Sequence, residues 1–140
     1  MSVPTVSFDN YNSADDFGMI LSDYEVSPAV KKTHFISVPG RNGDLDVSSY
    51  LGESYENRTI TITLNKRLNI DNLPVFQSEL ENKINGKRME IIFSNDSSYY
   101  WIGLVSLNSI TKLAKYMIEI NISCNVDPFK ISKTDGELSL

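Results

Sequence analysis

The chain has 140 residues, 41% of them hydrophobic and 22% charged, which is typical of one soluble globular domain. Its net charge of −5 argues against a nucleic-acid partner, because affinity for DNA or RNA comes largely from basic patches that release counterions. The single cysteine excludes an intramolecular disulfide. Because the chain also has only one histidine, any zinc site would need carboxylate ligands.

The N-terminal stretch, residues 1–18, has neither a basic start nor an apolar run, so it does not resemble a signal peptide. No segment approaches the roughly 18 apolar residues that a membrane-spanning helix needs. We therefore expect a protein that is synthesised and folds in a cytoplasm and has no membrane partner.

Alternating apolar residues predict three strands in the first third of the chain, at residues 5–8, 19–26 and 30–38. In the second of them, Ile20, Tyr24 and Val26 are expected on one face. The only histidine, His34, lies in the third, where a lone histidine is more often structural than catalytic.

Glycine-containing turn dipeptides follow at Pro39-Gly40 and Asn42-Gly43, and a short alternating segment at residues 44–47 predicts a further strand. Residues 59–64 form the clearest strand pattern, with isoleucine and leucine inward and three threonines outward. Between the two strands, residues 48–57 are mostly polar, acidic or tyrosine. The pattern predicts an extended two-stranded arm.

One helix interrupts the strands, because four apolar residues recur at helical spacing and form a single stripe: Leu73, Phe76, Leu80 and Ile84. Asp71 or Asn72 is expected to cap its start, and Pro74 is tolerated in the first turn. Gly86 supplies the left-handed residue that ends it. The helix should be about 12 residues long.

The rest of the chain again predicts strands, at residues 88–93, 99–107 and 115–124, the first two joined by a turn at 94–98. In the last strand, Tyr116 is expected on the same face as three isoleucines: Ile118, Ile120 and Ile122. Cys124 continues this alternation and is interpreted as a small core residue. We expect a folded domain over residues 1–130 and a polar tail over 131–140, of which the last eight residues are mobile.

The predicted fold class is mostly β (α+β): an antiparallel β-sandwich or split barrel with one α-helix and an extended β-hairpin arm. The sequence contains no phosphate-binding loop, nucleophile elbow or catalytic triad, so neither an enzyme nor a cofactor is expected. Asp44 and Asp46 could supply two calcium ligands, but solvated charge beside a turn is the preferred interpretation. Tyr99, Tyr100 and Trp101 suggest a sugar-stacking platform, although strand packing explains them better.

Several motifs occur in a characteristic order: "FDNYNSADDFGMIL", "ISVPGRNGDLDVSSYLGESYENRTITITL", the helix, "MEIIFSNDSSYYWIGLV" and "INISCNVDPFK". Together they resemble the N-terminal domain of the distal tail protein family of long-tailed (siphovirus-type) bacteriophages. In that family a "PGR-G-LD" turn precedes a "YENR" stretch and an alternating strand, and the domain closes with a "C-DPF"-like ending. The resemblance extends from about Ser7 to Lys130.

The resemblance implies a structural protein of the virion tail tip. Family members form a hexameric ring, the baseplate hub, which joins the tail tube protein to the tail-associated protein. Many members carry a galectin-like domain after the "DPF" ending, and this sequence departs from them by stopping ten residues after Lys130. The resemblance therefore implies neither carbohydrate binding nor arm attachment for this chain.

In such a ring the arm would lie on the adjacent subunit and pair with the edge of its sheet. The expected contact residues are concentrated in the arm and its end: Tyr50, Leu51, Glu53, Tyr55, Glu56 and Arg58. A tail tube or tube-completion ring subunit is the first alternative, and a small carbohydrate-binding β-sandwich module is the second.

Overall fold

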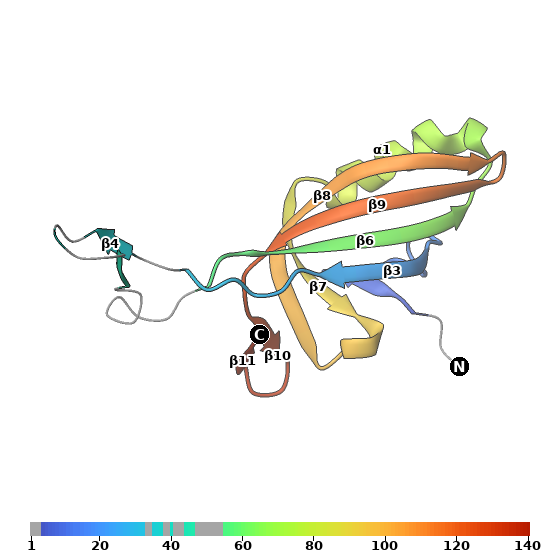
Figure 1. Cartoon of the computed structure of the whole chain (residues 1–140). Coiled ribbons are helices and arrows are strands. Elements are labelled where there is room, and N and C mark those ends of the chain that lie inside the picture. Colours follow the sequence, from blue (N-terminus) through green and yellow to red (C-terminus); the bar gives the residue numbers. More distant parts are fainter. Residues whose placement is uncertain (1–3, 33–34, 38–39, 41–43, 47–54) are drawn as a thin grey trace.

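The computed structural model describes residues 4–32, 35–37, 40, 44–46 and 55–140. In these residues the chain is mostly antiparallel β-sheet with one α-helix, which confirms the predicted fold class. The main sheet has nine strands, seven of them in the order β2-β1-β7-β8-β9-β6-β3, while β10 and β11 attach through β8. A separate two-stranded sheet joins β4 to β5 (Figure 1).

The first half of the chain contributes six strands: β1 (Val6–Phe8), β2 (Tyr11–Asn12), β3 (Ile20–Val26), β4 (Phe35–Ser37), β5 (Asp44–Asp46) and β6 (Arg58–Arg67). The second half contributes the helix, two 3-10 turns and five strands: η1 (Ile70–Asn72), α1 (Leu73–Ile84), β7 (Lys87–Phe93), η2 (Ser94–Asp96), β8 (Tyr99–Ala114), β9 (Met117–Val126), β10 (Lys130–Ser132) and β11 (Leu138–Ser139). His34, the Asn42-Gly43 turn and residues 47–54 lie outside the described residues.

Strand β8 connects the two halves of the main sheet. It pairs with β7 from Trp101 to Val105 and with β9 from Gly103 to Ala114, and its ribbon curves strongly between the two partners (Figure 1). At Gly103 an added Cβ would lie 2.2 Å from the carbonyl oxygen of Asn125. Only glycine therefore lets β8 and β9 approach each other so closely at the place where β8 serves both partners.

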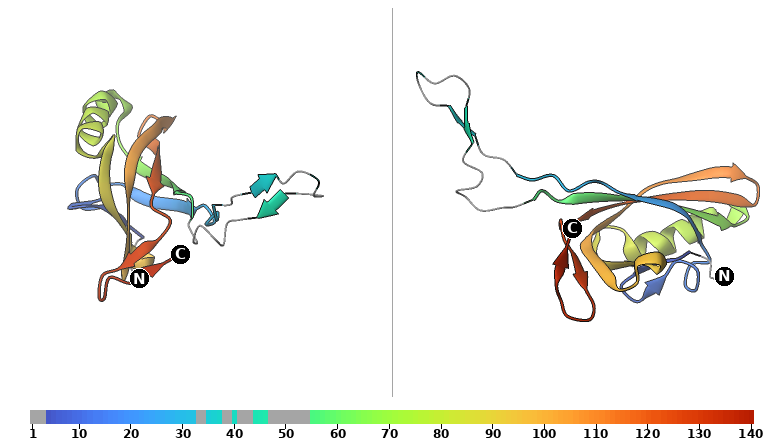
Figure 2. Two further views of the ribbon diagram at one scale, coloured as in Figure 1. Left: turned by 90° about the vertical axis from the view of Figure 1, so that its left-hand side faces the viewer. Right: turned by 60° about the horizontal axis from the view of Figure 1, so that its bottom comes forward.

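The sheet curls until its ends approach, as the views in Figure 2 show. Tyr24 on β3 stacks on Phe93 of β7 with ring centroids 3.8 Å apart and planes within 9° of parallel. Its hydroxyl donates a hydrogen bond of 2.7 Å to Oδ1 of Asn95. Side chains, and not hydrogen-bonded strands, therefore join β3 to β7. Of the two predicted architectures, sandwich and split barrel, the fold corresponds to the split barrel.

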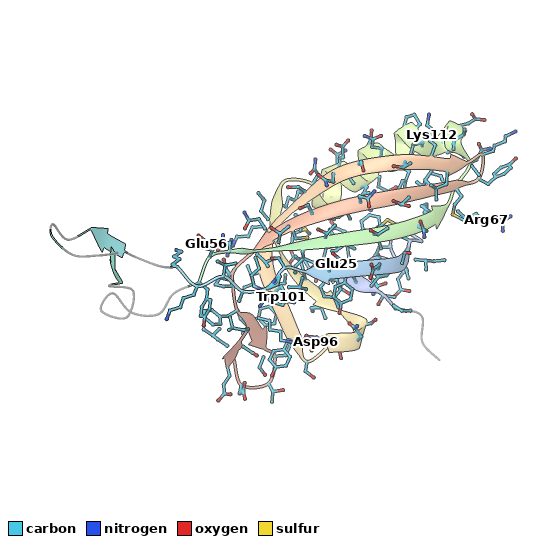
Figure 3. All side chains as sticks on the ribbon, in the orientation of Figure 1. Glu25, Glu56, Arg67, Asp96, Trp101 and Lys112 are labelled. Carbon is cyan, nitrogen blue, oxygen red and sulfur yellow. The ribbon has the colours of Figure 1, made fainter. Side chains whose placement is uncertain are left out.

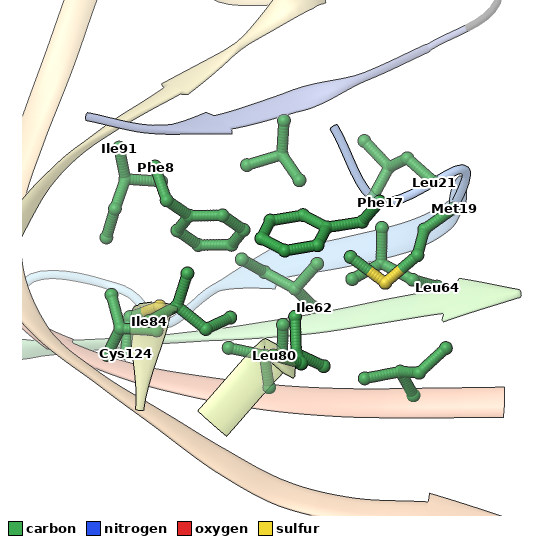
Figure 4. Close-up of a cluster of buried hydrophobic side chains, with 14 of the residues drawn as sticks. Phe8, Phe17, Met19, Leu21, Ile62, Leu64, Leu80, Ile84, Ile91 and Cys124 are labelled. Atoms are coloured by element: carbon green, nitrogen blue, oxygen red, sulfur yellow. The ribbon is translucent and has the colours of Figure 1, made fainter. Parts of the chain in front are cut away.

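The core fills the inside of the curled sheet (Figure 4). The predicted inner faces of β6 and β9 are confirmed, because their alternating residues are completely buried: Ile60, Ile62, Leu64, Ile118, Ile120, Ile122 and Cys124. The apolar stripe of α1 packs on the same core, and all four predicted residues are buried: Leu73, Phe76, Leu80 and Ile84.

Helix α1 has the predicted 12 residues. Asn72 occupies the N-cap position without a side-chain hydrogen bond, while Asn69 accepts one from the backbone N–H of Asp71 in the preceding turn. Gly86 follows the helix at a φ of 73°, which is the left-handed conformation that the sequence predicted for its C-terminal end.

Two predicted inward positions are wrong. Ile20 is 57% exposed because the register shifts between Leu21 and Asp23, so that Leu21, and not Ile20, shares the inner face with Tyr24. Tyr116 is 53% exposed because it lies in the turn between β8 and β9, where the alternation of β9 has not yet begun.

The C-terminal segment, which the sequence predicted as a polar tail, forms a hairpin of β10 and β11, and the mobility of its last eight residues stays a prediction. Strand β10 pairs with β11 and also with the start of β8, where Ile131 lies opposite Tyr100. Lys130 forms an ion pair of 2.8 Å with Asp96 and lies over the ring of Tyr99. No helix in the described part of the chain is long and apolar enough to cross a membrane.

Candidate subunit interface

The predicted arm corresponds to the segment between β3 and β6, and its described strands form their own small sheet. Strand β4 pairs with β5 in antiparallel register, with Ile36 opposite Leu45. Figures 1 and 2 place this sheet apart from the nine-stranded sheet, beyond the ends of β3 and β6. We call residues 31–55 the arm.

Backbone hydrogen bonds continue the β3–β6 ladder outward to the beginning of the arm. Ser27 and Thr59 are linked twice, because the N–H of Ser27 donates to the carbonyl of Thr59 and the N–H of Thr59 donates to Oγ of Ser27, both at 2.9 Å. Farther out, the N–H of Glu56 donates to the carbonyl of Val30 at 2.8 Å. A bridge between Lys31 and Tyr55 joins the first and the last residue of the arm.

Three of the predicted contact residues lie at this junction, which we call the arm base. Tyr55 and Arg58 are half-buried, and Glu56 is exposed. Figure 3 shows Glu56 at the end of the body from which the arm leaves. The other three, Tyr50, Leu51 and Glu53, lie outside the described residues. A role for any of the six in contact with a second subunit stays a prediction.

Arg58 connects three parts of the chain at the arm base. Its Nε donates a hydrogen bond of 2.9 Å to the carbonyl of Ser27, and Nη1 donates one of 3.4 Å to the carbonyl of Pro128. Its guanidinium carbon lies 5.1 Å from the centre of the Trp101 ring, close enough for a cation–π interaction. A planar guanidinium can make all these contacts at once, which a lysine cannot.

Tyr55 packs at the same junction. Its ring meets that of Phe129 edge to face, with centroids 5.7 Å apart and planes at 90°. Phe129 belongs to the segment between β9 and β10, so the arm base is tied to the start of the C-terminal hairpin. Sequence reasoning preferred a structural role for Trp101 but found neither its partner nor that of Phe129, because more than 40 residues separate each contacting pair.

The aromatic rings at the start of β8 are largely covered by other side chains. Trp101 is only 5% exposed and Tyr99 is covered by Lys130, so these rings do not form an open stacking platform. In the described part of the chain no three histidine, cysteine, aspartate or glutamate side chains gather into a possible metal site, and no pocket is found. Burial raises the pKa of the Cys124 thiol to about 12, which keeps it protonated and unreactive at neutral pH.

Comparison with known proteins shows a likeness of structure and none of sequence. No family model matches the sequence, and no curated protein matches it either. A solved structure that is similar is that of SPP1 Dit (gp 19.1), described as a paradigm of the hub adsorption apparatus in phages that infect Gram-positive bacteria. The two chains superpose with a TM-score of 0.71 at 16% sequence identity.

The superposition covers 94% of this chain and 53% of the Dit chain, so this chain spans about half the length of that protein. At this identity the likeness establishes a shared fold. This shared fold agrees with the fold that the resemblance of the sequence motifs implied.

Proposed function

We propose that this chain is a structural subunit of a bacteriophage tail tip. It forms the baseplate hub, a hexameric ring that joins the tail tube protein on one face to the tail-associated protein on the other. The protein is synthesised in the host cytoplasm and resides in the virion, and it needs no cofactor. The likeness of fold to a hub protein supports this role, as does the resemblance of the ordered motifs to the distal tail protein family.

The observation that carries the proposal is the arm with its anchored base. An isolated two-stranded ribbon is marginal in water, because it buries too little apolar surface to offset its conformational entropy. Here the base is held by Arg58 and Tyr55, while β4 and β5 form a sheet separate from the body. A neighbouring subunit would supply the missing surface, and a closed ring would supply it for every copy.

The predicted arm residues have distinct roles in this proposal. Tyr50 and Leu51 place apolar surface against the neighbour, and Tyr55 adds the part of its ring that Phe129 of its own chain leaves uncovered. Each tyrosine keeps its hydroxyl in contact with water. Glu53 and Glu56 set the register between subunits by charge rather than adding much affinity. Arg58 acts from within its own subunit, because its contacts with Ser27 and Pro128 direct the arm outward.

Electron micrographs of the purified protein, combined with light scattering after gel filtration, test the proposal directly. We expect single closed rings whose mass corresponds to six copies. Long stacked tubes would instead favour the alternative of a tail tube subunit. A strict monomer at every concentration, together with no ring density at the phage tail tip, would overturn the hub proposal.

An arm deletion tests the role of the arm. Because Lys31 and Tyr55 lie directly opposite each other, residues 32–54 can be replaced by an Asn-Gly turn that preserves this bridge. The variant keeps the contacts of Tyr55 and Arg58, so circular dichroism should show an intact fold while light scattering shows monomers. Rings formed by the folded variant would show that the arm is not the subunit contact.

A further inference from the structure

The C-terminal hairpin, formed by β10 and β11, is held to the body by few contacts. Strand β10 pairs with the start of β8 at two positions only, and the N–H of Lys133 donates one further hydrogen bond of 3.0 Å to the carbonyl of Ser98. Residues 130–140 are all half-buried or exposed, whereas β9 ends in the core at Val126. Because its docking buries little apolar surface, the hairpin should leave β8 at a lower cost than any strand of the core.

Lys130, the first residue of the hairpin, makes the strongest of these contacts. Its Nζ lies 2.8 Å from Oδ2 of Asp96 and 4.6 Å from the centre of the Tyr99 ring. The side chain of Lys130 is only 21% exposed and that of Asp96 36%, so water screens this ion pair less than a pair on the open surface. Asp96 belongs to η2 and Tyr99 to β8. Lys130 therefore anchors the hairpin to two elements of the body at once.

The segment between β9 and β10 is short and is fixed at both of its ends. At its beginning, the N–H of Asp127 donates a hydrogen bond of 3.0 Å to the carbonyl of Ile102, which holds it to the body. At its end, Lys130 holds it to η2 and β8. Only Pro128 and Phe129 lie between these two anchors, and both contact the arm base. The position of these two residues therefore depends on the hairpin as well as on the body.

We propose that the C-terminal hairpin and the arm base form one coupled conformational device, in which docking of the hairpin on β8 sets the order of the arm base. When the hairpin leaves β8, the segment keeps its anchor at Asp127 and loses the one at Lys130. Phe129 then no longer supports the ring of Tyr55, and the carbonyl of Pro128 is no longer held beside its donor. The coupling is reciprocal, because an ordered arm base stabilises the docked hairpin by the same free energy.

Undocking of the hairpin loosens the arm base without detaching it. Arg58 keeps its hydrogen bond of 2.9 Å to the carbonyl of Ser27 and its place over the Trp101 ring, and neither contact involves the hairpin. Figures 1 and 2 show the hairpin at the end of the body from which the arm leaves. Any contact that pulls on the hairpin therefore changes the arm. This link exists within a single chain and goes beyond the proposed function, which assigns no role to the hairpin.

Hydrogen exchange in the full chain tests the coupling, because one backbone N–H reports on each side. The N–H of Lys133, bonded to Ser98, reports docking of the hairpin, and the N–H of Glu56, bonded to Val30, reports order at the arm base. Lys130→Met removes the charge of the anchor, and exchange should rise about 3- to 10-fold at both N–H groups. All chains are compared at a protein concentration at which light scattering gives the same mass, so that assembly does not contribute.

Lys83→Met is the matched control, because Lys83 on α1 combines the same two kinds of contact. Its Nζ forms an ion pair of 2.9 Å with Glu79 and lies 5.6 Å from the centre of the Tyr11 ring. The change in net charge is equal in the two variants. We expect exchange at Lys133 and Glu56 to change less than about 2-fold in the control. A rise as large as in the first variant would show that a general loss of stability moves both reporters, and would overturn the coupling.

The reverse experiment starts from the arm base. Tyr55→Ala removes the ring that meets Phe129 and changes no residue of the hairpin. Exchange at the N–H of Lys133 should rise about 3-fold, because the docked hairpin loses the support of the arm base. The N–H of Met19, bonded to the carbonyl of Ser13 in the buried core, serves as the reference and should not change. A purely local role of Tyr55 would leave Lys133 unaffected.

Each other result overturns the coupling. If Lys130→Met raises exchange at Lys133 alone, the hairpin leaves β8 without any effect on the arm base. If neither N–H responds, Lys130 does not hold the hairpin, and the device lacks its anchor. If Tyr55→Ala leaves Lys133 unchanged, the required reciprocity is absent. Ring assembly is measured separately by light scattering, so failure of the coupling leaves the proposed function standing, and coupled reporters in a strictly monomeric protein would have the opposite meaning.

Discussion

The two halves of β8 show how differently one continuous strand can be used. In the first half, Trp101 and Val105 are buried and the strand has a neighbour on each side. In the second half, residues 111–114 are all exposed and only β9 pairs with them. Because the backbone is extended in both halves, strand conformation alone does not tell whether a residue contributes to the core.

The difference separates stability from assembly. The first half gains free energy from burial, so substitutions there should change the melting temperature. In the second half only Leu107 and Ile110 pack partly against the core, and residues 111–114 are exposed. A surface of this kind is expected to contribute to contacts between molecules, where the same substitutions would change association and leave the fold intact.

The largest effect should follow removal of the buried aromatic ring in the first half. Trp101→Ala should lower the free energy of unfolding by about 3–5 kcal/mol, because it leaves a cavity and also removes the ring beneath Arg58. Leu104→Ala, on the same strand but 44% exposed, is the control and should cost much less. Urea titration measures both, and equal losses would show that burial does not distinguish these positions.

A smaller effect is expected at the arm base, which connects the body to the arm. Arg58→Met should cost about 1–3 kcal/mol, because the carbonyls of Ser27 and Pro128 lose a charged donor. Arg88→Met is the matched control, since its ion pair with Asp127 is exposed and worth about 0–1 kcal/mol. Hydrogen exchange should also rise at Glu56 in the first variant, and unchanged exchange there would argue against Arg58 as the anchor.

The smallest effect on stability should come from the second half of β8. Leu113→Ala removes an exposed side chain, so the free energy of unfolding should stay within about 0.5 kcal/mol of the original. Assembly should nevertheless weaken if this exposed apolar side chain contacts a second subunit. A marked loss in the thermal melt would show that Leu113 belongs to the core and would remove the contrast between the two halves.

The spacing of apolar residues along the sequence was sufficient to predict several elements of the fold. The helix over Leu73–Ile84 follows from apolar residues spaced three to four apart, and the glycine after it marks its end. The inner faces of β6 and β9 follow from apolar residues at every second position. Such periodicity is a property of a single element, so the sequence alone reveals it. The same reasoning found the arm, because a polar stretch between two alternating segments cannot form a core of its own.

Tertiary structure decided the features that depend on distant partners. The register shift after Leu21 turned Ile20 outward, and the β8–β9 pairing placed Tyr116 in a turn. Strand β10 found a partner in the distant start of β8. The arm base likewise exists only because the curled sheet brings Arg58 beside Trp101 and Pro128. Periodicity gives the face of each strand, but which strands meet, and at which residue, depends on how the whole sheet closes around its core.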